Sequence, residues 1–188
     1  GCISRLTDFV MTRAMQDLEG RPDIQVAVNT SASEFQLPGF AARVAAAATA
    51  LGFPPERLEV EVTETAMLNV EAARRTIDEL RAYGFGVALD DFGSGYTSLH
   101  ALRTLKFTTL KIDRSFVERC VSDTASAAII HAVIGVGRAL GMKIVCEGVE
   151  TADQANFLRI AGTHYMQGYH FHRAMRLQAL LGVTEEAA

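Results

Sequence analysis

The chain has 188 residues, of which 49% are hydrophobic and 21% charged, and its formal net charge is −4. This composition suits one folded domain and excludes a disordered chain. The negative charge argues against tracking along a nucleic acid polymer, and no apolar run reaches the roughly 18 residues that a membrane span needs.

Short β-rich runs alternate with longer amphipathic runs along the chain. A helix is predicted first, at Cys2–Glu19, and its apolar stripe is formed by Ile3, Leu6, Val10, Ala14 and Leu18. Strands are predicted, in order, at Val26–Asn29, Leu58–Thr63, Gly86–Asp91, Thr109–Asp113, Lys143–Val149 and Tyr165–Phe171. Helices with clear start and stop signals run from Asn69 to Gly84, from Asp123 to Gly141 and from Thr151 to Gly162.

This alternation predicts an α/β fold with a parallel sheet, either open or closed into a barrel. About six strand–helix units are present, two fewer than a complete eight-stranded barrel. The opening helix has no strand before it, and the chain begins with Gly1 instead of Met. We therefore expect residues 1–188 to be a single domain that is truncated at its N-terminus.

Polar residues lie at the ends of five successive predicted strands. They are Asn29; Glu61; Asp90 with Asp91; Lys111; and Glu147 with Glu150. Because the carboxyl ends of parallel strands carry the site in such folds, we expect one shared rim. In the fourth strand, Lys111 and Asp113 have the same parity and therefore share a face. Any one of these residues taken alone also fits a solvated strand end or an ion pair, so the hypothesis depends on the whole set.

So many carboxylates at one rim require positive counter-charge, which one lysine does not supply. An all-oxygen donor set of Asp, Glu and Asn suits Mg²⁺ or Mn²⁺. The number of ligands predicts two ions, which together can activate water and hold a phosphodiester.

The cysteines indicate a reducing compartment. Cys2, Cys120 and Cys146 are far apart and odd in number, without the spacing of a disulfide framework or a zinc site. We expect free thiols in the cytoplasm.

The same residues resemble the EAL family of cyclic di-GMP phosphodiesterases. The matching stretches are Val26–Ser31, Leu58–Thr65, Ala88–Leu99, Leu110–Val117, Glu147–Thr151 and Gln167–Tyr169, which agree in order and spacing over almost the whole chain. The resemblance implies a (β/α)₈ TIM-like barrel that hydrolyses cyclic di-GMP to linear pGpG with two Mg²⁺ or Mn²⁺ ions. By position, it implies that the metal ligands are Asn29, Glu61, Asp90, Asp91 and Glu147.

The resemblance also implies roles for the remaining residues. Lys111 would orient the attacking water and stabilise developing charge, with Glu150 beside the metals in support. Glu64 would anchor the loop Asp91–Ser98, which in this family couples the metal site, the substrate and the dimer interface, and a homodimer is therefore expected. Asp113 and Gln167 are candidates for contact with cyclic di-GMP. Diguanylate cyclase, PAS or receiver domains often precede such modules, but none is present in this sequence.

Three departures from the family pattern stand out. The Glu-Ala-Leu signature is absent, together with its metal-ligand Glu and a following Arg that contacts the substrate. Glu34 stands where the family usually has Gln, and the stretch His170–Met175 replaces a Pro-rich segment. We expect an active parent protein of which this chain alone has an incomplete site. Two alternatives remain open: a non-catalytic cyclic di-GMP receptor and a single-metal barrel lyase with a lysine base.

Overall fold

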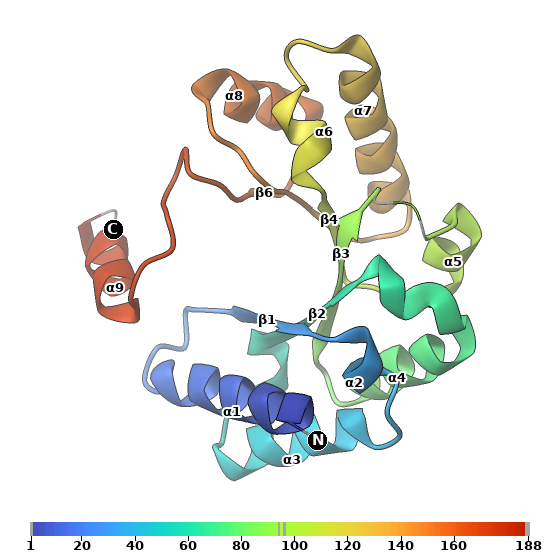
Figure 1. Cartoon of the computed structure of the whole chain (residues 1–188). Helices are drawn as coiled ribbons and strands as arrows, with labels where there is room; N and C mark the ends of the chain where they lie inside the picture. Colours follow the sequence, from blue (N-terminus) through green and yellow to red (C-terminus); the bar gives the residue numbers. More distant parts are fainter. Residues whose placement is uncertain (1, 94, 96, 187–188) are drawn as a thin grey trace.

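A computed structural model describes residues 2–93, 95 and 97–186, and its centre is one parallel sheet of six strands (Figure 1). The strands are β1 (Val26–Thr30), β2 (Leu58–Thr63), β3 (Gly86–Phe92), β4 (Thr109–Ile112), β5 (Lys143–Cys146) and β6 (Tyr165–Met166). Their order in space is their order in the chain, and every neighbouring pair is parallel. The expected α/β fold is therefore confirmed, in the form of a curled half-barrel.

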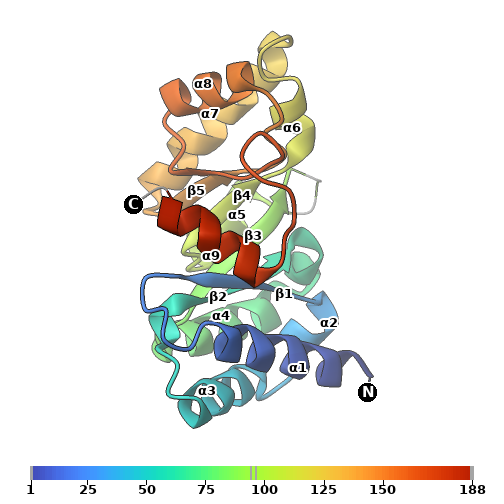
Figure 2. The same cartoon turned by 90° about the vertical axis from the view of Figure 1, so that its left-hand side faces the viewer.

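One helix precedes the first strand, others connect successive strands, and these helices pack on the outer side of the sheet, while a last helix follows β6 (Figures 1 and 2). They are α1 (Cys2–Asp17), α2 (Ala32–Phe35), α3 (Phe40–Ala50), α4 (Val70–Ala82), α5 (Leu99–Thr104), α6 (Arg114–Glu118), α7 (Thr124–Ala139), α8 (Ala152–Ala161) and α9 (Leu177–Glu186), with short 3₁₀ turns at Pro55–Arg57 and Glu64–Asn69. In Figure 1 α9 stands apart from the other helices, on the open side of the sheet, and in Figure 2 it lies in front of the sheet. Within the described residues, β1 and β6 each pair on one side only, and so the half-barrel stays open there.

The predicted helix caps are confirmed. The side chain of Asn69 accepts a hydrogen bond from the Ala72 amide, and that of Asp123 accepts from the Ser126 amide. Thr151 and Gln154 form a reciprocal capping box at the start of α8. Gly162 ends α8 with a φ of 91°, in the left-handed region that glycine adopts without strain.

The two faces of the sheet differ in chemistry. Its outer face carries buried apolar side chains such as Val60, Leu89 and Leu110, which belong to the same core cluster as Ile77 of α4 and Ile134 of α7. The inner face is largely polar and is lined in part by Glu59, Glu61, Thr109, Lys111 and Lys143. The hydrophobic core thus lies between the sheet and the helices, and the polar residues lie on the concave side of the sheet.

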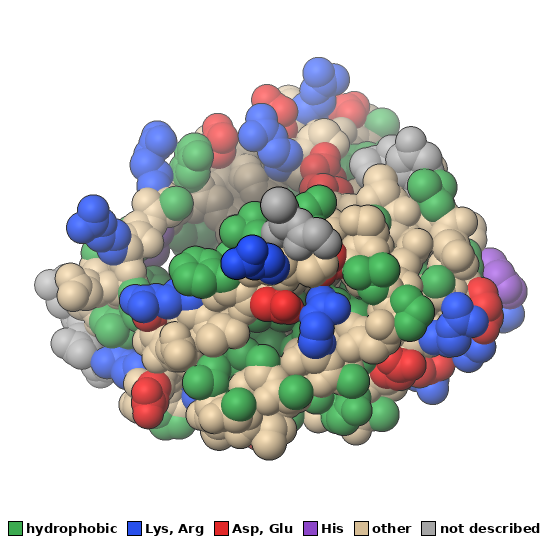
Figure 3. Space-filling view, turned by 60° about the horizontal axis from the view of Figure 1, so that its bottom comes forward, with side chains coloured by type: hydrophobic (Ala, Val, Ile, Leu, Met, Phe, Trp, Pro, Cys, Tyr) green, Lys and Arg blue, Asp and Glu red, His purple; other side chains and the backbone are tan. Residues whose placement is uncertain are grey.

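The predicted stripe of α1 is mostly wrong. Met11, Met15 and Leu18 are buried in the core, whereas Ile3 and Leu6 are 55% and 61% exposed. Apolar residues lie on two faces of the helix. The packing of α1 against α3 and β1 buries the face that carries Met11 and Met15. Figure 3, seen from the side of α1 and α3, shows hydrophobic side chains at the surface among charged ones.

Three predicted strands are too long. β4 ends at Ile112, because Asp113 instead caps α6 by accepting a hydrogen bond from the Ser115 amide. β5 ends at Cys146, and β6 contains only Tyr165 and Met166. In both of the latter cases the polar residues that follow lie in loops at the end of the sheet.

No helix within the described residues has both the length and the apolar content to span a membrane.

Candidate functional site

Lys111 of β4 connects carboxylates from β2, from β3 and from the loop after β5. Its ammonium Nζ lies 2.9 Å from Glu61 Oε2, 3.1 Å from Asp90 Oδ1 and 2.8 Å from Glu147 Oε1. The side chain is buried, and its three donors match the three oxygens. The predicted convergence of Glu61, Asp90, Lys111 and Glu147 at one rim is therefore observed, with the lysine in the middle of the acids.

Small residues on β3 let the side chains on either side of it meet. Glu61 of β2 lies in register with Ala88 of β3, and Ala88 lies in register with Thr109 of β4. The methyl group of Ala88 leaves the space above β3 open. Glu61 can therefore reach across to Lys111, which lies two residues after Thr109 and so on the same face of the sheet.

Asp90 and Asp91 reach the same cluster by a local irregularity. Two successive residues of a regular strand point to opposite faces. Here the pairing of β3 with β4 shifts register between Leu89 and Phe92, and Asp91 has a φ of +55°, the only positive value at a described non-glycine residue. Asp91 is thereby turned to the side of Asp90, and its amide donates to Asp90 Oδ1 at 3.0 Å.

Three of these acids could hold a metal ion. Asp90, Asp91 and Glu147 each offer a carboxylate oxygen, and these oxygens lie within 4.8 Å of one another. Hard oxygen donors of this kind are the ligands that Mg²⁺, Mn²⁺ and Ca²⁺ prefer. The donor chemistry therefore fits a divalent cation. Glu61 lies next to this set through Lys111, and Asn29 lies in register with Glu61 on the neighbouring strand, where its side chain is exposed.

Burial and charge shift the pKa values at this site. Burial raises the pKa of the Glu61 and Glu147 carboxyls, and the hydrogen bonds from Lys111 only partly oppose it. Burial also raises the pKa of Asp91, helped by repulsion from Asp90. For Lys111, burial lowers the pKa, but the carboxylates of Glu147 and Glu61 outweigh it and hold the pKa above its usual value. Lys111 is therefore charged at neutral pH, among acids that gain from further positive charge.

Glu64 holds the loop that follows β3. This buried carboxylate accepts hydrogen bonds from the amides of Gly95, at 2.7 Å, and Gly93, at 3.3 Å. Gly93 has a φ of +110°, which strains any residue with a side chain. Ser94 and Tyr96 of this loop lie outside the described residues. The predicted contact of Glu64 with the loop is observed on both sides of Ser94.

The remaining predicted residues line a cavity of about 250 Å³ beside the carboxylates. Its walls are formed by Asp91, Asp113, Arg114, Glu147, Gly148, Glu150, Gln167, Gly168 and Tyr169. The structure thus brings Asp113, Glu150 and Gln167 next to the acidic cluster. Sequence reasoning did not single out Arg114 or Tyr169 as site residues, although both lie in the stretches that carried the resemblance.

Glu34, which departs from the family pattern, lies outside this cluster. Its carboxylate is buried and its Oε1 accepts from Arg43 Nη2 at 3.0 Å, while Arg43 also binds Asp8 of α1. This chain of contacts joins α1, α2 and α3. The acid at position 34 therefore takes part in helix packing.

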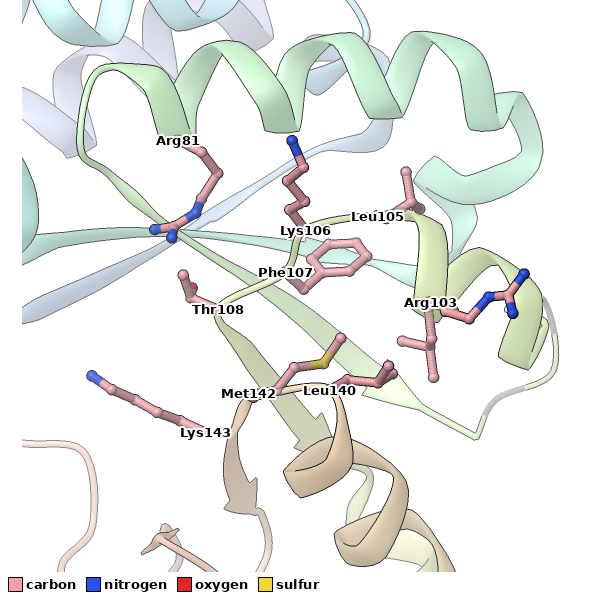
Figure 4. A pocket seen from close by; sticks show the side chains of 11 residues that line it. Arg81, Arg103, Leu105, Lys106, Phe107, Thr108, Leu140, Met142 and Lys143 are labelled. Atoms are coloured by element: carbon pink, nitrogen blue, oxygen red, sulfur yellow. The ribbon is translucent and has the colours of Figure 1, made fainter.

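A larger cavity, of about 390 Å³, lies at the opposite ends of β4 and β5 (Figure 4). Four cationic side chains surround it, but Figure 4 shows that they diverge: Lys106 extends toward α4, where it pairs with Asp78 at 3.3 Å, and Arg103 points away. Arg81 donates to the backbone carbonyl of Phe85. The apolar residues beneath, such as Phe107 and Met142, are already buried in the core. This cavity has no converging set of groups.

The chain is similar in sequence to known proteins. A family model described as the EAL domain matches residues 1–174. The chain is 38% identical over 187 residues to the bifunctional diguanylate cyclase/cyclic di-GMP phosphodiesterase MucR of Pseudomonas aeruginosa, covering 96% of this chain and 27% of the relative. It is also 38% identical over 186 residues to the cyclic di-GMP phosphodiesterase NbdA of the same organism, covering 96% of this chain and 24% of that relative.

Solved structures show the same fold. A structure of the MucR phosphodiesterase in complex with c-di-GMP has a TM-score of 0.90 at 38% identity, covering 96% of this chain and 75% of that one. The EAL domain of Mycobacterium smegmatis DcpA has a TM-score of 0.83 at 32% identity, covering 96% of this chain and 80% of that one. The chain spans about a quarter of the length of the curated relatives it matches.

Proposed function

This chain belongs to the EAL domain family, and we propose that the protein containing it hydrolyses cyclic di-GMP to linear pGpG. The observation that carries the proposal is the contact of Lys111 with carboxylates from β2, β3 and the loop after β5, next to the metal-compatible set of Asp90, Asp91 and Glu147. Relatives of the chain are named as cyclic di-GMP phosphodiesterases, which supports the same reaction.

We propose two Mg²⁺ or Mn²⁺ ions as the cofactors, with Asn29, Glu61, Asp90, Asp91 and Glu147 as their ligands in this chain. Such ions, when bound, lower the pKa of water and offset charge on the phosphodiester. The relatives are longer than this chain, and we propose that residues beyond it complete the barrel and the ligand set.

In the proposed reaction, the oxygen of a water molecule forms a bond to phosphorus. The water gives up one proton to solvent, the bond from phosphorus to the 3′ oxygen breaks, and that oxygen takes a proton from solvent and leaves as a hydroxyl. Lys111 orients the attacking water and stabilises negative charge on the phosphoryl oxygens. Glu150 supports the site from the cavity wall, and Asp113 and Gln167 contact the nucleotide from the same wall.

Glu64 keeps the loop after β3 in place by its bonds to Gly93 and Gly95. We propose that this loop links the site to a homodimer interface, and that diguanylate cyclase, PAS or receiver domains precede this domain in the natural protein. The buried free thiols of Cys120 and Cys146 suit a reducing cytoplasm.

The test is to incubate the purified natural protein that contains this chain with cyclic di-GMP and Mg²⁺ or Mn²⁺, and to separate the products by chromatography. We expect linear pGpG, formed more slowly by roughly 100-fold or more in the Lys111→Ala variant at the same protein concentration. Binding of cyclic di-GMP without any turnover would assign the protein to the receptor class. The absence of both binding and turnover would contradict the proposal altogether.

A further inference from the structure

A second polar layer lies directly beneath the contact of Glu61 with Lys111. Glu59 precedes Glu61 by two residues on β2, and Thr109 precedes Lys111 by two residues on β4. Glu59 Oε1 accepts hydrogen bonds from Thr109 Oγ1 at 2.6 Å and from Thr108 Oγ1 at 2.9 Å. Because a strand rises by about 3.3 Å per residue, this layer lies roughly 7 Å from the layer of Lys111.

The bridge spans a strand. β2 and β4 are not neighbours, since β3 lies between them. The residue of β3 in register with Glu59 is Gly86, and a Cβ at Gly86 would lie 3.0 Å from Glu59 Oε1 and 3.1 Å from its Cγ. The missing side chain at Gly86 therefore creates the space through which Glu59 reaches β4.

The hydroxyl protons needed for the bridge are available. The Thr108 hydroxyl accepts from the Val87 amide at 2.8 Å and has one proton to donate, either to Glu59 or to the Val87 carbonyl. That carbonyl already accepts from the Thr108 amide at 2.8 Å. The Val87 carbonyl has a second lone pair and lies 2.8 Å from the Thr108 hydroxyl, so it competes with Glu59 for this proton. The bond from Thr109 is therefore the main link between Glu59 and the start of β4, and Thr108 adds a second contact when its proton points to Glu59.

We infer that Glu59 is a positioning residue, which fixes β4 against β2 and so places the ammonium of Lys111 beside Glu61. The inference rests on the proposed function for its effect on turnover. A slip of β4 along β2 is resisted by the short bond from Thr109 to Glu59, only one side-chain layer away from the reacting groups. Displacements of about 1 Å at an active site lower rates by up to roughly 100-fold.

The experiment compares Glu59→Ala, Glu59→Gln and Thr109→Val in the natural protein. Glu59→Gln keeps a carbonyl oxygen that can accept both hydroxyls, whereas Thr109→Val keeps the shape and removes one of them. We expect Glu59→Ala and Thr109→Val to lower kcat by about 10- to 100-fold at unchanged KM, and Glu59→Gln to stay within about twofold of the natural protein. The double variant Glu59→Ala, Thr109→Val should lose no more than Glu59→Ala alone, because both changes break one bridge.

A second measurement separates this inference from the proposed function. Crystal structures should show the distance between Lys111 Nζ and Glu61 Oε2, 2.9 Å in the native chain, kept in Glu59→Gln and lengthened in Thr109→Val. If the natural protein has no phosphodiesterase activity, the proposed function fails, and this distance alone still decides the positioning role. If Glu59→Ala does not fold, Thr109→Val tests the same bridge in its place. An unchanged distance and kcat in Thr109→Val, or a Glu59→Gln variant as impaired as Glu59→Ala, would overturn the inference.

Discussion

Asp90 and Asp91 are consecutive in the chain, yet their carboxylates join one cluster with Glu147. The left-handed φ of Asp91 and the register shift between β3 and β4 produce this arrangement. Two candidate ligands for a cation thereby come from one strand end, and Asp91 is held there by its backbone conformation and by its amide bond to Asp90.

Replacement of Asp91 should separate its chemical role from its backbone role. Asn tolerates the left-handed region and lacks the negative charge, while Ala also loses the tolerance of that region. We expect Asp91→Asn to weaken Mn²⁺ binding at least about tenfold and to keep the melting temperature, and Asp91→Ala to lower both. Titration calorimetry with Mn²⁺ and thermal unfolding of the same samples would check this. Native Mn²⁺ affinity in Asp91→Asn would remove Asp91 from the ligand set.

Lys111 should matter to turnover beyond its contribution to stability. We expect Lys111→Ala and Lys111→Arg each to lower kcat by roughly 100-fold or more, as for the loss of one donor at an electrostatic site. Arg fails because its planar fork does not reproduce three bonds from one nitrogen. Binding of cyclic di-GMP should persist, which equilibrium binding measurements can show.

The same variants have a stability control. Removal of Lys111 leaves Glu61, Asp90 and Glu147 without their shared cation, and so thermal stability in chelator should fall, and recover in part with Mg²⁺. If kcat per folded molecule stays near normal in Lys111→Ala, the lysine has only a structural role.

Activity should require Mg²⁺ or Mn²⁺, and Ca²⁺ should inhibit. The donor set is all oxygen, and Ca²⁺ adopts a larger and looser coordination shell than Mg²⁺. We expect excess chelator to abolish hydrolysis of cyclic di-GMP, added Mn²⁺ to restore it, and Ca²⁺ to compete with Mg²⁺ in initial-rate measurements. Full hydrolysis in chelator would refute the metal mechanism.

The stability of the metal-free protein should fall as pH rises above the ordinary carboxyl range. Burial raises the pKa of Glu61 and Glu147 in the folded state above the ordinary carboxyl value of 4.5. Between 4.5 and the raised value, the unfolded chain has lost protons that the folded chain still binds, and so increasing pH favours unfolding. Below 4.5 both states are protonated and the effect disappears.

Denaturant unfolding in chelator between pH 4.5 and 7.5 would measure this dependence. We expect Glu61→Gln to flatten the slope, because the amide does not titrate. Glu71→Gln is a matched control, since Glu71 is exposed and its pKa is lowered by Arg74. An equal slope in the native protein and Glu61→Gln would show that the buried acid does not titrate in this range.

Local patterns in the sequence determined the order of strands and helices, the caps at Asn69 and Thr151, and the shared rim of Glu61 and Lys111. These features depend on periods of two and 3.6 residues and on cap residues close in sequence, which a single chain displays directly. The resemblance to the EAL family added the identities of the metal-ligand and loop-anchoring candidates.

Only the tertiary structure decided four other features: the buried face of α1, the capping role of Asp113, the turn of Asp91 into the cluster, and the reach of Glu59 across Gly86. Each depends on residues distant in sequence or on backbone dihedral angles that more than one residue type can adopt. When apolar residues lie on two faces of a helix, the sequence does not determine which face is buried, and packing against neighbouring elements decides it. Glu59 of β2 can contact β4 only where the residue of β3 between them has no side chain. The register of β2 with β3 decides that this residue is Gly86.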